Sequence, residues 1–235
     1  MTSVVTTVRA YGDAGLLVEF DGGDRDQRWG AARDLGAALR SAPPPGVLDV
    51  VASFASVFVS FDPLAVESGA LARAIESMPT ADQGQTEPRL FTIPVAYGGD
   101  FGPDLEQVAE ALGFPPARLV DLHTRRPWFV RLVGSPAGAP LTEGPRLPAN
   151  VPRLATPRTR VEPGSVGLSG AQCIVYNAPS PGGWQLIGRT PLKLFDLTSP
   201  PHVGYRPGDR IRFTAIDHTR WDELYGRPLV GEGVG

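Results

Sequence analysis

Residues that could bind a small molecule gather between residues 156 and 196. The polar and aromatic members of this stretch are Arg158, Arg160, Ser165, Gln172, Trp184 and Arg189, with glycines among them. A guanidinium group is a planar fork of donors that fits a carboxylate or a phosphate. So many glycines indicate turns, bulges or a close approach of the backbone to another group. The stretch predicts a rigid β-rich surface that receives an anionic or amide-bearing molecule, or else a β-barrel whose glycines only form corners.

The arginines of the second half of the chain are the main candidates for contacting an anion. They are Arg153, Arg158, Arg160 and Arg189. Burying a charge without a partner costs free energy. Either these side chains pair with Glu162, Asp196 and Asp209, or some of them are left for a ligand carboxylate or phosphate. Trp184 follows a Pro-Gly-Gly turn, so its indole either forms a pocket wall or closes the end of a barrel.

Few side chains offer acid–base or nucleophilic chemistry. His123 could exchange a proton near neutral pH, yet it stands where a helix should end, and the helix dipole alone favours a histidine there. Cys173 is the one cysteine, and because the sequence beside it suggests no activating base, we expect a buried and unreactive thiol. No histidines and carboxylates have the spacing of metal ligands, which predicts no bound metal.

Two motifs that would identify a reaction are missing from the sequence. Ser165 lies among glycines but outside a G-x-S-x-G elbow, which argues against a serine hydrolase. A G-x-x-x-x-G-K-S/T phosphate loop is missing too. If ATP is used, we expect this chain to supply only part of a shared site.

The bulk composition bounds the class of protein. The chain has 235 residues, of which 42% are hydrophobic and 20% charged, and this describes one large or two modest globular domains. Its net charge of -3 does not favour a general nucleic-acid role. A single cysteine fits a reducing compartment, and neither a membrane-spanning run nor a signal-peptide pattern is present. We therefore expect a cytoplasmic protein.

The first part of the chain predicts a small α/β domain. Strands are expected at residues 4–8, 16–20, 47–52, 56–61 and 90–95, and helices at residues 25–40 and 64–78. The buried stripe of the second helix is expected to be Leu64, Leu71, Ala74, Ile75 and Met78. We interpret the order as β-α-β-β-α-β, the split βαβ or ferredoxin-like pattern, over residues 1–92.

The second part, residues 93–235, predicts a β-barrel preceded by two short helices. The helices are expected near residues 103–112 and 115–123, followed by a strand at residues 128–133. Residues 134–157 are proline-rich and predict a long loop that is functional, partly disordered or a lid. Short strands between glycine turns then indicate a closed or nearly closed barrel, and they are expected at residues 165–168, 173–176, 184–188, 192–195 and 210–215. Residues 226–235 are expected to form a mobile tail.

Several segments together resemble one known family. PRTRVEPGSVGLSGAQ, followed by SPGGWQLIGRTPLKLFD, is similar to the signature of the allophanate hydrolase subunit 1 family, also called the family of 5-oxoprolinase B subunits. YGDAGLLVEF, SVFVSFDP and IPVAYGGDFGPDLEQVAEALG agree with it, so the resemblance runs from about Tyr11 to about Ile216. That family includes a bacterial inhibitor of a sporulation histidine kinase.

The resemblance implies a fold, a reaction and partners. The family's C-terminal half is cyclophilin-like, so an α+β protein with a ferredoxin-like domain and a cyclophilin-like barrel is expected. Family members pair with a related C-type subunit, of the allophanate hydrolase subunit 2 kind, and with an A-type subunit they form an ATP-dependent 5-oxoprolinase. That enzyme opens 5-oxo-L-proline to L-glutamate while it hydrolyses ATP. By motif match, the chain's share of the pocket is Arg158, Ser165, Gln172, Trp184 and Arg189, without individual catalytic roles.

One segment departs from the family pattern, and two other functions compete. An aromatic-rich loop usually follows the strand near Trp128, but here the residues from Gly134 to Leu141 are GSPAGAPL. If that loop lines the pocket, substrate preference or activity would differ. The first competing function is a regulator that binds and inhibits a histidine kinase. The second is a carboxyltransferase or allophanate-hydrolase type of protein in urea metabolism, as in biotin-dependent urea carboxylase.

Overall fold

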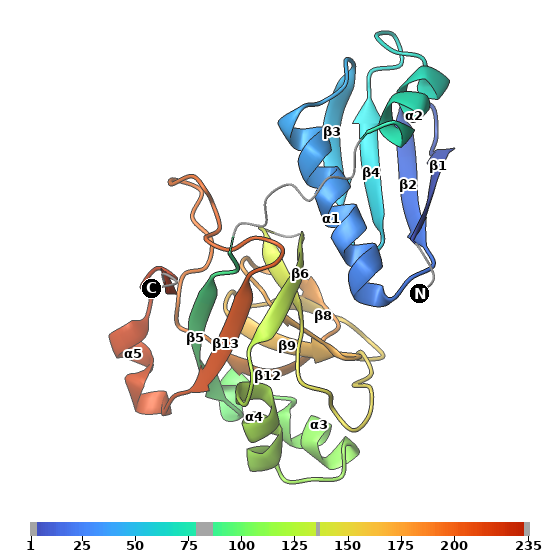
Figure 1. Cartoon of the computed structure of the whole chain (residues 1–235). Coiled ribbons are helices and arrows are strands. Elements are labelled where there is room, and N and C mark those ends of the chain that lie inside the picture. The colour runs from blue at the N-terminus through green and yellow to red at the C-terminus, as the bar shows by residue number, and fades with distance from the viewer. Residues whose placement is uncertain (1–3, 79–86, 135–136, 233–235) are drawn as a thin grey trace. The chain divides into compact units, whose positions relative to one another are not determined.

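The structure is a computed structural model of the chain and describes residues 4–78, 87–134 and 137–232 (Figure 1). It is a mixed α+β protein that divides into two compact units, Met1–Thr86 and Glu87–Gly235. None of the helices in the described ranges combines the length and the apolar character that crossing a membrane requires. The two units are described separately below.

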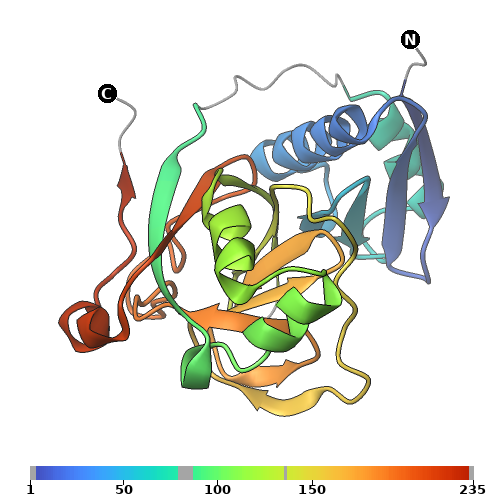
Figure 2. The same ribbon diagram turned by 90° about the horizontal axis from the view of Figure 1, so that it is seen from below.

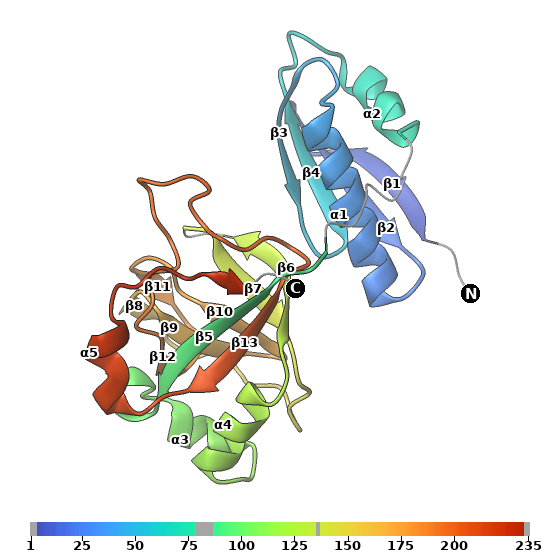
Figure 3. The same ribbon diagram turned by 60° about the vertical axis from the view of Figure 1, so that its left-hand side comes forward.

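The first unit is a four-stranded antiparallel sheet with two helices on one face (Figure 3). The strands, in sheet order, are β1 (Val5–Ala10), β2 (Gly15–Asp21), β4 (Ser56–Phe61) and β3 (Val47–Ala52). Alternate residues of the two central strands are buried, as a half-covered sheet requires. They pack against α1 (Arg25–Ser41) and α2 (Ser68–Glu76) in one hydrophobic cluster. Asp24 and Gln27 form a capping box that starts α1.

The predicted strand order of this unit is wrong at one place. The strand expected at residues 90–95 exists as β5 (Leu90–Tyr97), but it pairs with β13 (Arg210–Ala215) in the second unit. β1 instead takes the edge position beside β2, so the order of elements in the first unit is β-β-α-β-β-α. The boundary between the two units lies before Glu87 rather than near residue 92. An alternating apolar strand carries no local signal of which sheet it joins, so its sequence could not show this.

The second helix of this unit starts later than its apolar pattern predicts. Leu64 is 97% exposed, because Asp62 accepts a hydrogen bond from the Leu64 N–H in a local turn. The helix begins at Ser68, where the Glu67 carboxylate accepts bonds from the first free backbone N–H groups. Leu71 and Ile75 are buried as expected, whereas Ala74 is exposed.

The second unit is a closed seven-stranded barrel (Figure 1). In barrel order, the strands are β12 (Gln185–Arg189), β9 (Ser165–Ser169), β10 (Gln172–Val175), β7 (Ala139–Glu143), β6 (Trp128–Gly134), β13 and β5. Pairing of β12 with β5 closes the ring, and β5 runs parallel to β13. The interior is filled by apolar side chains, with Trp128, Ile187 and Phe213 fully buried.

Two short helices cover one end of the barrel, as Figure 2 shows. They are α3 (Leu105–Ala111) and α4 (Pro116–Thr124), preceded by the single-turn helix η1 (Gly99–Phe101). Leu105, Val108 and Leu119 enter the barrel core. α3 contacts β12, and the link between β5 and α3 passes so close to β12 that Gly102 has no room for a side chain.

The predicted loop and tail also differ from the structure. Residues 139–143 of the proline-rich stretch form β7, which pairs with β6 and β10, and Asn177 donates to the backbone carbonyls of Ala137 and Gly138 at the tip of this hairpin. The strand expected at residues 192–195 is reduced to isolated bridges. The tail is ordered as far as β14 (Gly231–Glu232), which pairs with β5. Ser135, Pro136 and residues 233–235 lie outside the described residues.

The remaining elements are small. β8 (Arg158–Val161) and β11 (Ser180–Gly182) form a two-stranded sheet, and η2 (His218–Arg220) leads into α5 (Trp221–Leu224). Asp209 directly precedes β13 and is fully buried. Its carboxylate accepts hydrogen bonds from the backbone and side chain of Arg89 and from the Arg206 N–H. These bonds tie the start of β5 to the turn before β13.

We expect the substitution Gly102→Ala to lower the thermal midpoint of the second unit. The added Cβ would overlap the backbone carbonyl of Ile187, which has no rotamer to escape into. Overpacking of this kind costs about 1–3 kcal/mol. Gly204→Ala is the matched control, because the nearest atom to its Cβ lies at an ordinary 3.5 Å. Circular dichroism melts of the two variants test this, and equal stability would contradict the close approach to β12.

Candidate functional site

The outer face of the barrel carries a small apolar cluster beside several of the predicted site residues. Along β10 the side chains alternate: Cys173 and Val175 enter the barrel core, whereas Ile174 and, just after the strand, Tyr176 belong to a separate outer cluster. Trp184 packs against this outer cluster and is half-buried. The indole thus forms part of a wall on the outside of the barrel.

Glycines let these two aromatic side chains lie close to the sheet. A Cβ at Gly182 would overlap the Tyr176 hydroxyl. A Cβ at Gly167 would come within 3.0 Å of the Trp184 Cβ and 3.5 Å of the Tyr176 ring. Neither glycine has a positive φ, so the requirement is for space and not for a left-handed backbone. At these two positions the glycines shape the surface rather than make corners.

Arg158 projects from β8 to Asp104 at the start of α3. Its Nη2 donates to the Asp104 Oδ1 over 2.7 Å, while the Asp104 Oδ2 accepts from the Leu186 backbone N–H over 2.6 Å. The Asp104 carboxylate is nearly buried, and the Arg158 side chain is 28% exposed. The other terminal nitrogen of Arg158, Nη1, is buried and has no hydrogen-bond partner among the described residues. This guanidinium group therefore keeps an unused donor.

Arg153 lies beside the same surface without a carboxylate partner in the described part of the chain. Its guanidinium group approaches Gly183, where Nε would lie 3.4 Å from an added Cβ. Burial raises the pKa of the Tyr176 hydroxyl, while the Trp184 backbone N–H and the charges of Arg153 and Arg158 lower it by less. Tyr176 therefore stays protonated near neutral pH and is in the electrostatic reach of both arginines.

The structure divides the predicted site residues into groups. Arg158 and Trp184 belong to the surface just described. Gln172 pairs with Ser169 at the turn of the β9–β10 hairpin. It therefore lies on β10, two strands away from Gln185, which follows Trp184 on β12. Ser165 and Arg189 pair with each other at the opposite end of β9 and β12. Arg189 there donates to the Pro163 carbonyl, and its guanidinium carbon lies 5.5 Å from the centre of the Trp221 ring.

The acidic partners proposed for the arginines are mostly used elsewhere. Arg160 does pair with Glu162, over 2.6 Å, and both side chains are largely exposed. Asp196 pairs with Lys193, and Asp209 with Arg89. On this face, Arg153 therefore has no carboxylate partner among the described residues, and Arg158 keeps one buried terminal nitrogen unpaired.

His123 and Cys173 lie inside the barrel, so neither can contact a ligand at this surface. The His123 ring is buried between Trp128 and Phe213, its Nδ1 lies 2.7 Å from the Tyr97 hydroxyl and its Nε2 lies 3.4 Å from the Cys173 Sγ. Burial lowers the pKa of His123 to about 3 and raises the pKa of the Cys173 thiol. The buried thiol is confirmed. His123 is structural as predicted, but as a neutral ring in the barrel core and not as a cation favoured by the helix dipole.

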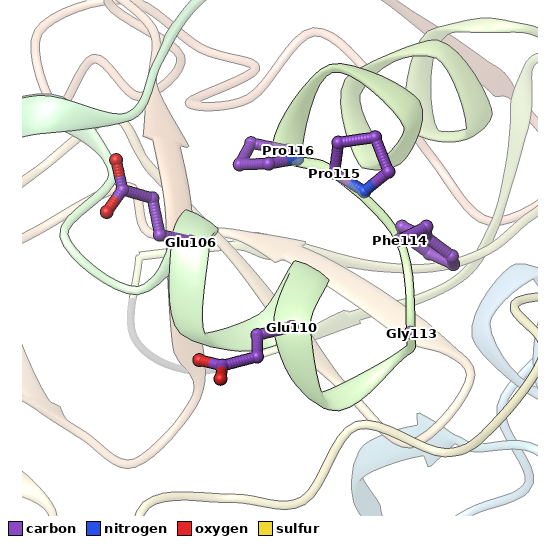
Figure 4. Close-up of a pocket in the computed structure, with 6 residues that line it drawn as sticks. All are labelled: Glu106, Glu110, Gly113, Phe114, Pro115 and Pro116. Atoms are coloured by element: carbon purple, nitrogen blue, oxygen red, sulfur yellow. The ribbon is translucent and has the colours of Figure 1, made fainter.

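A wider hollow lies at the link between α3 and α4, but none of the predicted site residues lines it. Figure 4 shows the side chains of Glu106 and Glu110 on α3, the rings of Phe114 and Pro115 on the link, and the ring of Pro116 at the start of α4. Its two carboxylates repel an anionic ligand. Among the residues that the structure describes, no three His, Cys, Asp or Glu side chains come close enough together to hold a metal ion.

Sequence reasoning missed three residues that shape this region: Asp104, Tyr176 and Gln185. Asp104 could not be predicted as a site residue, because its contact with Arg158 spans 54 residues. Gln185 lies two residues before the core residue Ile187, so strand alternation would have pointed its polar side chain inward. A glutamine at a position that alternation points inward was therefore the sequence signal that could have identified Gln185.

The chain resembles known proteins over most of its length. The family described as "Carboxyltransferase domain, subdomain C and D" matches residues 6–203. The B subunit of the Bacillus subtilis 5-oxoprolinase is 33% identical over 221 residues, which cover 89% of this chain and 92% of that protein. The corresponding B subunit from Haemophilus influenzae is 37% identical over 80% of this chain and 85% of its own length.

Solved structures share the fold. The protein TTHA0988 superposes with a TM-score of 0.75 at 32% identity over 90% of this chain, which spans 40% of the length of TTHA0988. A conserved uncharacterized protein of Pyrococcus horikoshii, matched over its whole length, gives a TM-score of 0.54 at 30% identity and covers 92% of this chain. The Kluyveromyces lactis urea amidolyase shares the fold with a TM-score of 0.75 at 19% identity, covering 97% of this chain and 16% of that protein.

We expect the buried His123 to destabilise the protein as the pH falls. Its pKa in the folded state is about 3, below the ordinary value of about 6.5 that it regains on unfolding. Between these pH values the unfolded state binds the extra proton, so the free energy of unfolding falls by roughly 1.4 kcal/mol for each pH unit below about 6.5.

Urea unfolding of the second unit at pH 7 and pH 5 measures this loss. His123→Gln removes the titrating group and should reduce the difference between the two pH values, whereas the exposed His202→Gln should leave it unchanged. An identical pH dependence in the wild type and in His123→Gln would show that His123 is not held neutral in the fold.

Proposed function

Since the chain belongs to the family of the carboxyltransferase domain, subdomain C and D, we propose that it is the B-type subunit of a 5-oxoprolinase. Its relatives named as B subunits of 5-oxoprolinase are matched over nearly their whole length. The observation that carries the proposal is the unused, buried Nη1 donor of Arg158, which pairs in the sheet with Gly182 two residues before Trp184 and acts electrostatically on Tyr176. 5-Oxo-L-proline is a carboxylate at neutral pH, and a guanidinium group is suited to bind it.

The reaction opens 5-oxo-L-proline to L-glutamate with hydrolysis of ATP. The lactam carbonyl is a poor electrophile, and transfer of a phosphoryl group to its oxygen would create a leaving group for attack by water. Charge develops on oxygen during such a transfer and is stabilised by arginine or backbone N–H donors. A fixed cation at the carboxylate also holds the substrate in one orientation for that transfer.

The residues of this chain have binding and orienting roles in the proposal. Arg158 and Arg153 direct donors at the substrate carboxylate, and Asp104 fixes the orientation of Arg158. Trp184 and Tyr176 form an apolar wall on the face that carries the two arginines, and this wall limits access of water to the bound carboxylate. Ser165 and Arg189 lie at the other end of the β9–β12 pair, and Gln172 lies on β10, two strands from β12. We therefore keep those three as predicted contacts for a larger ligand or a partner.

The proposal requires partner proteins. The chain contains no phosphate-loop sequence, and the glycines before Trp184 lead into the strand β12 rather than a helix, so they do not build the phosphate cradle of a helix N-terminus. We propose that the site is completed by related C-type and A-type subunits, which supply most of the contacts to ATP. A cytoplasmic location stays a prediction.

A carboxyltransferase function is the second candidate, because the matching family is described as a carboxyltransferase domain. A Saccharomyces cerevisiae urea amidolyase is also 32% identical over 97 residues, which cover 39% of this chain and 5% of that protein. Biotin-dependent carboxyl transfer by the co-expressed subunits would favour this candidate. The histidine-kinase inhibitor stays a prediction, and binding of a kinase by an otherwise inactive complex would favour it.

We also propose the finer fold names that the resemblance implies. In the first unit, β1 occupies the sheet edge beside β2, where a split βαβ domain places its last strand, so the unit fits a permuted ferredoxin-like arrangement. In the second unit, a closed barrel with a pair of helices at one end supports the cyclophilin-like description.

We expect Arg158→Gln to impair the co-expressed complex in ATP-dependent formation of glutamate from 5-oxo-L-proline. Loss of a charge-assisted hydrogen bond costs about 1.5–3 kcal/mol, so kcat/KM should fall about 10- to 150-fold, with part of the loss as a higher KM. Glutamate release at varied 5-oxo-L-proline measures both constants.

Arg160→Gln is the matched control, because Arg160 lies two residues away on the same strand and pairs with the exposed Glu162. It should retain nearly full activity. Co-purification of each variant with its partners shows that the complex still assembles. An assembled Arg158→Gln complex with wild-type kcat/KM would contradict the assignment of Arg158 to the substrate.

A further inference from the structure

A cavity of about 290 Å³ lies where α3 covers the end of the barrel. One wall is α3 and its C-cap, and the other is formed by residues 150–152 and the first residue of β12. Its apolar lining includes Val108, Leu112 and Val151, and its polar lining consists of the amide side chains of Gln107, Asn150 and Gln185. No lining residue is charged, so the cavity suits a neutral group that is partly apolar.

Gln185, which lines this cavity, has an unused acceptor in its side-chain amide. Gln185 is 4% exposed, and its Nε2 donates to the Pro152 carbonyl over 3.1 Å. A carbonyl oxygen can only accept, which fixes the nitrogen of the amide toward Pro152 and the oxygen away from it. That oxygen, Oε1, is buried and finds no partner among the described residues. Buried acceptors are nearly always hydrogen-bonded, so this one calls for a donor from a ligand.

The cavity adjoins the arginine surface through two hydrogen bonds. Residues 152–154 run beside residues 183–185, with the Gln185 side chain bonded to Pro152 and the Leu154 N–H donating to the Gly183 carbonyl over 2.8 Å. Arg153 lies between these two bonds in sequence and is exposed. A molecule with a neutral end in the cavity could thus present an anionic end to Arg153 at the rim.

We propose that this cavity is the subsite that binds the amide end of the substrate, a small lactam whose N–H donates to Gln185 Oε1. The methylene groups of the ring then contact Val108, Leu112 and Val151, while Gln107 and Asn150 offer donors for the lactam oxygen. This inference deepens the proposed function and rests on it for the identity of the substrate.

A neutral lactam tests the subsite apart from the reaction. The nitrogen-15-labelled full chain is titrated with 2-pyrrolidinone, and we expect shifts of the Gln185 side-chain amide and of the backbone amides of Val108 and Val151. N-methyl-2-pyrrolidinone lacks the N–H and leaves Oε1 unpaired, so it should bind at least about tenfold more weakly.

Two Ala→Phe variants control for the place of binding. Ala111 lines the cavity and Ala117 does not, and both are exposed helix residues. Ala111→Phe fills the cavity without removing a polar group and should abolish the shifts, whereas Ala117→Phe should keep them. Equal shifts in both variants, or equal affinity for the two lactams, would overturn the assignment of this cavity.

The reaction of the co-expressed complex separates the two proposals. A wild-type complex that forms glutamate, and an Ala111→Phe complex that does so equally well, would overturn the subsite and leave the 5-oxoprolinase function standing. An inactive wild-type complex in which this chain still binds 2-pyrrolidinone through Gln185 would support the subsite and reject the proposed reaction.

Discussion

The Asp104 carboxylate is the interaction on which the candidate site depends. One oxygen holds Arg158 from β8, the other accepts the Leu186 N–H of β12, and the Asp104 N–H donates to the Leu186 carbonyl at the start of α3. Three elements that are far apart in the sequence therefore meet at one nearly buried charge. A buried carboxylate needs such partners, because an unpaired one would cost several kcal/mol.

Two buried polar atoms near β12, the Arg158 Nη1 and the Gln185 Oε1, have no hydrogen-bond partner among the described residues. Asp104 satisfies one terminal nitrogen of Arg158 and leaves the other buried without a partner in the described part of the chain. On the neighbouring segment, Pro152 satisfies the nitrogen of the Gln185 amide and leaves the oxygen equally unused by those residues. A free donor and a free acceptor of this kind are the complement of a molecule that carries both a carboxylate and an amide N–H.

Much of the fold, but only part of the site, could be predicted from the sequence. Alternation and turn residues correctly indicated the barrel strands β9, β10, β12 and β13, because these signals are local. The pairing of β5 with β13 and the contact of Arg158 with Asp104 join residues more than fifty positions apart, which no local pattern encodes. Ser165 and Arg189 share a motif with Trp184, yet the length of β9 and β12 separates them from it. The hairpin of β7 was hidden in a proline-rich stretch that suggested only a loop.

The most direct test of the central claim is a crystal structure of the assembled subunits with 5-oxo-L-proline bound. We predict ligand density between Arg158 and Gln185, with a carboxylate oxygen about 3 Å from an arginine nitrogen of this surface and the ring nitrogen at a similar distance from Gln185 Oε1. Density for the ligand elsewhere, with Arg158 held by Asp104 alone and the cavity beside α3 without ligand, would contradict the account.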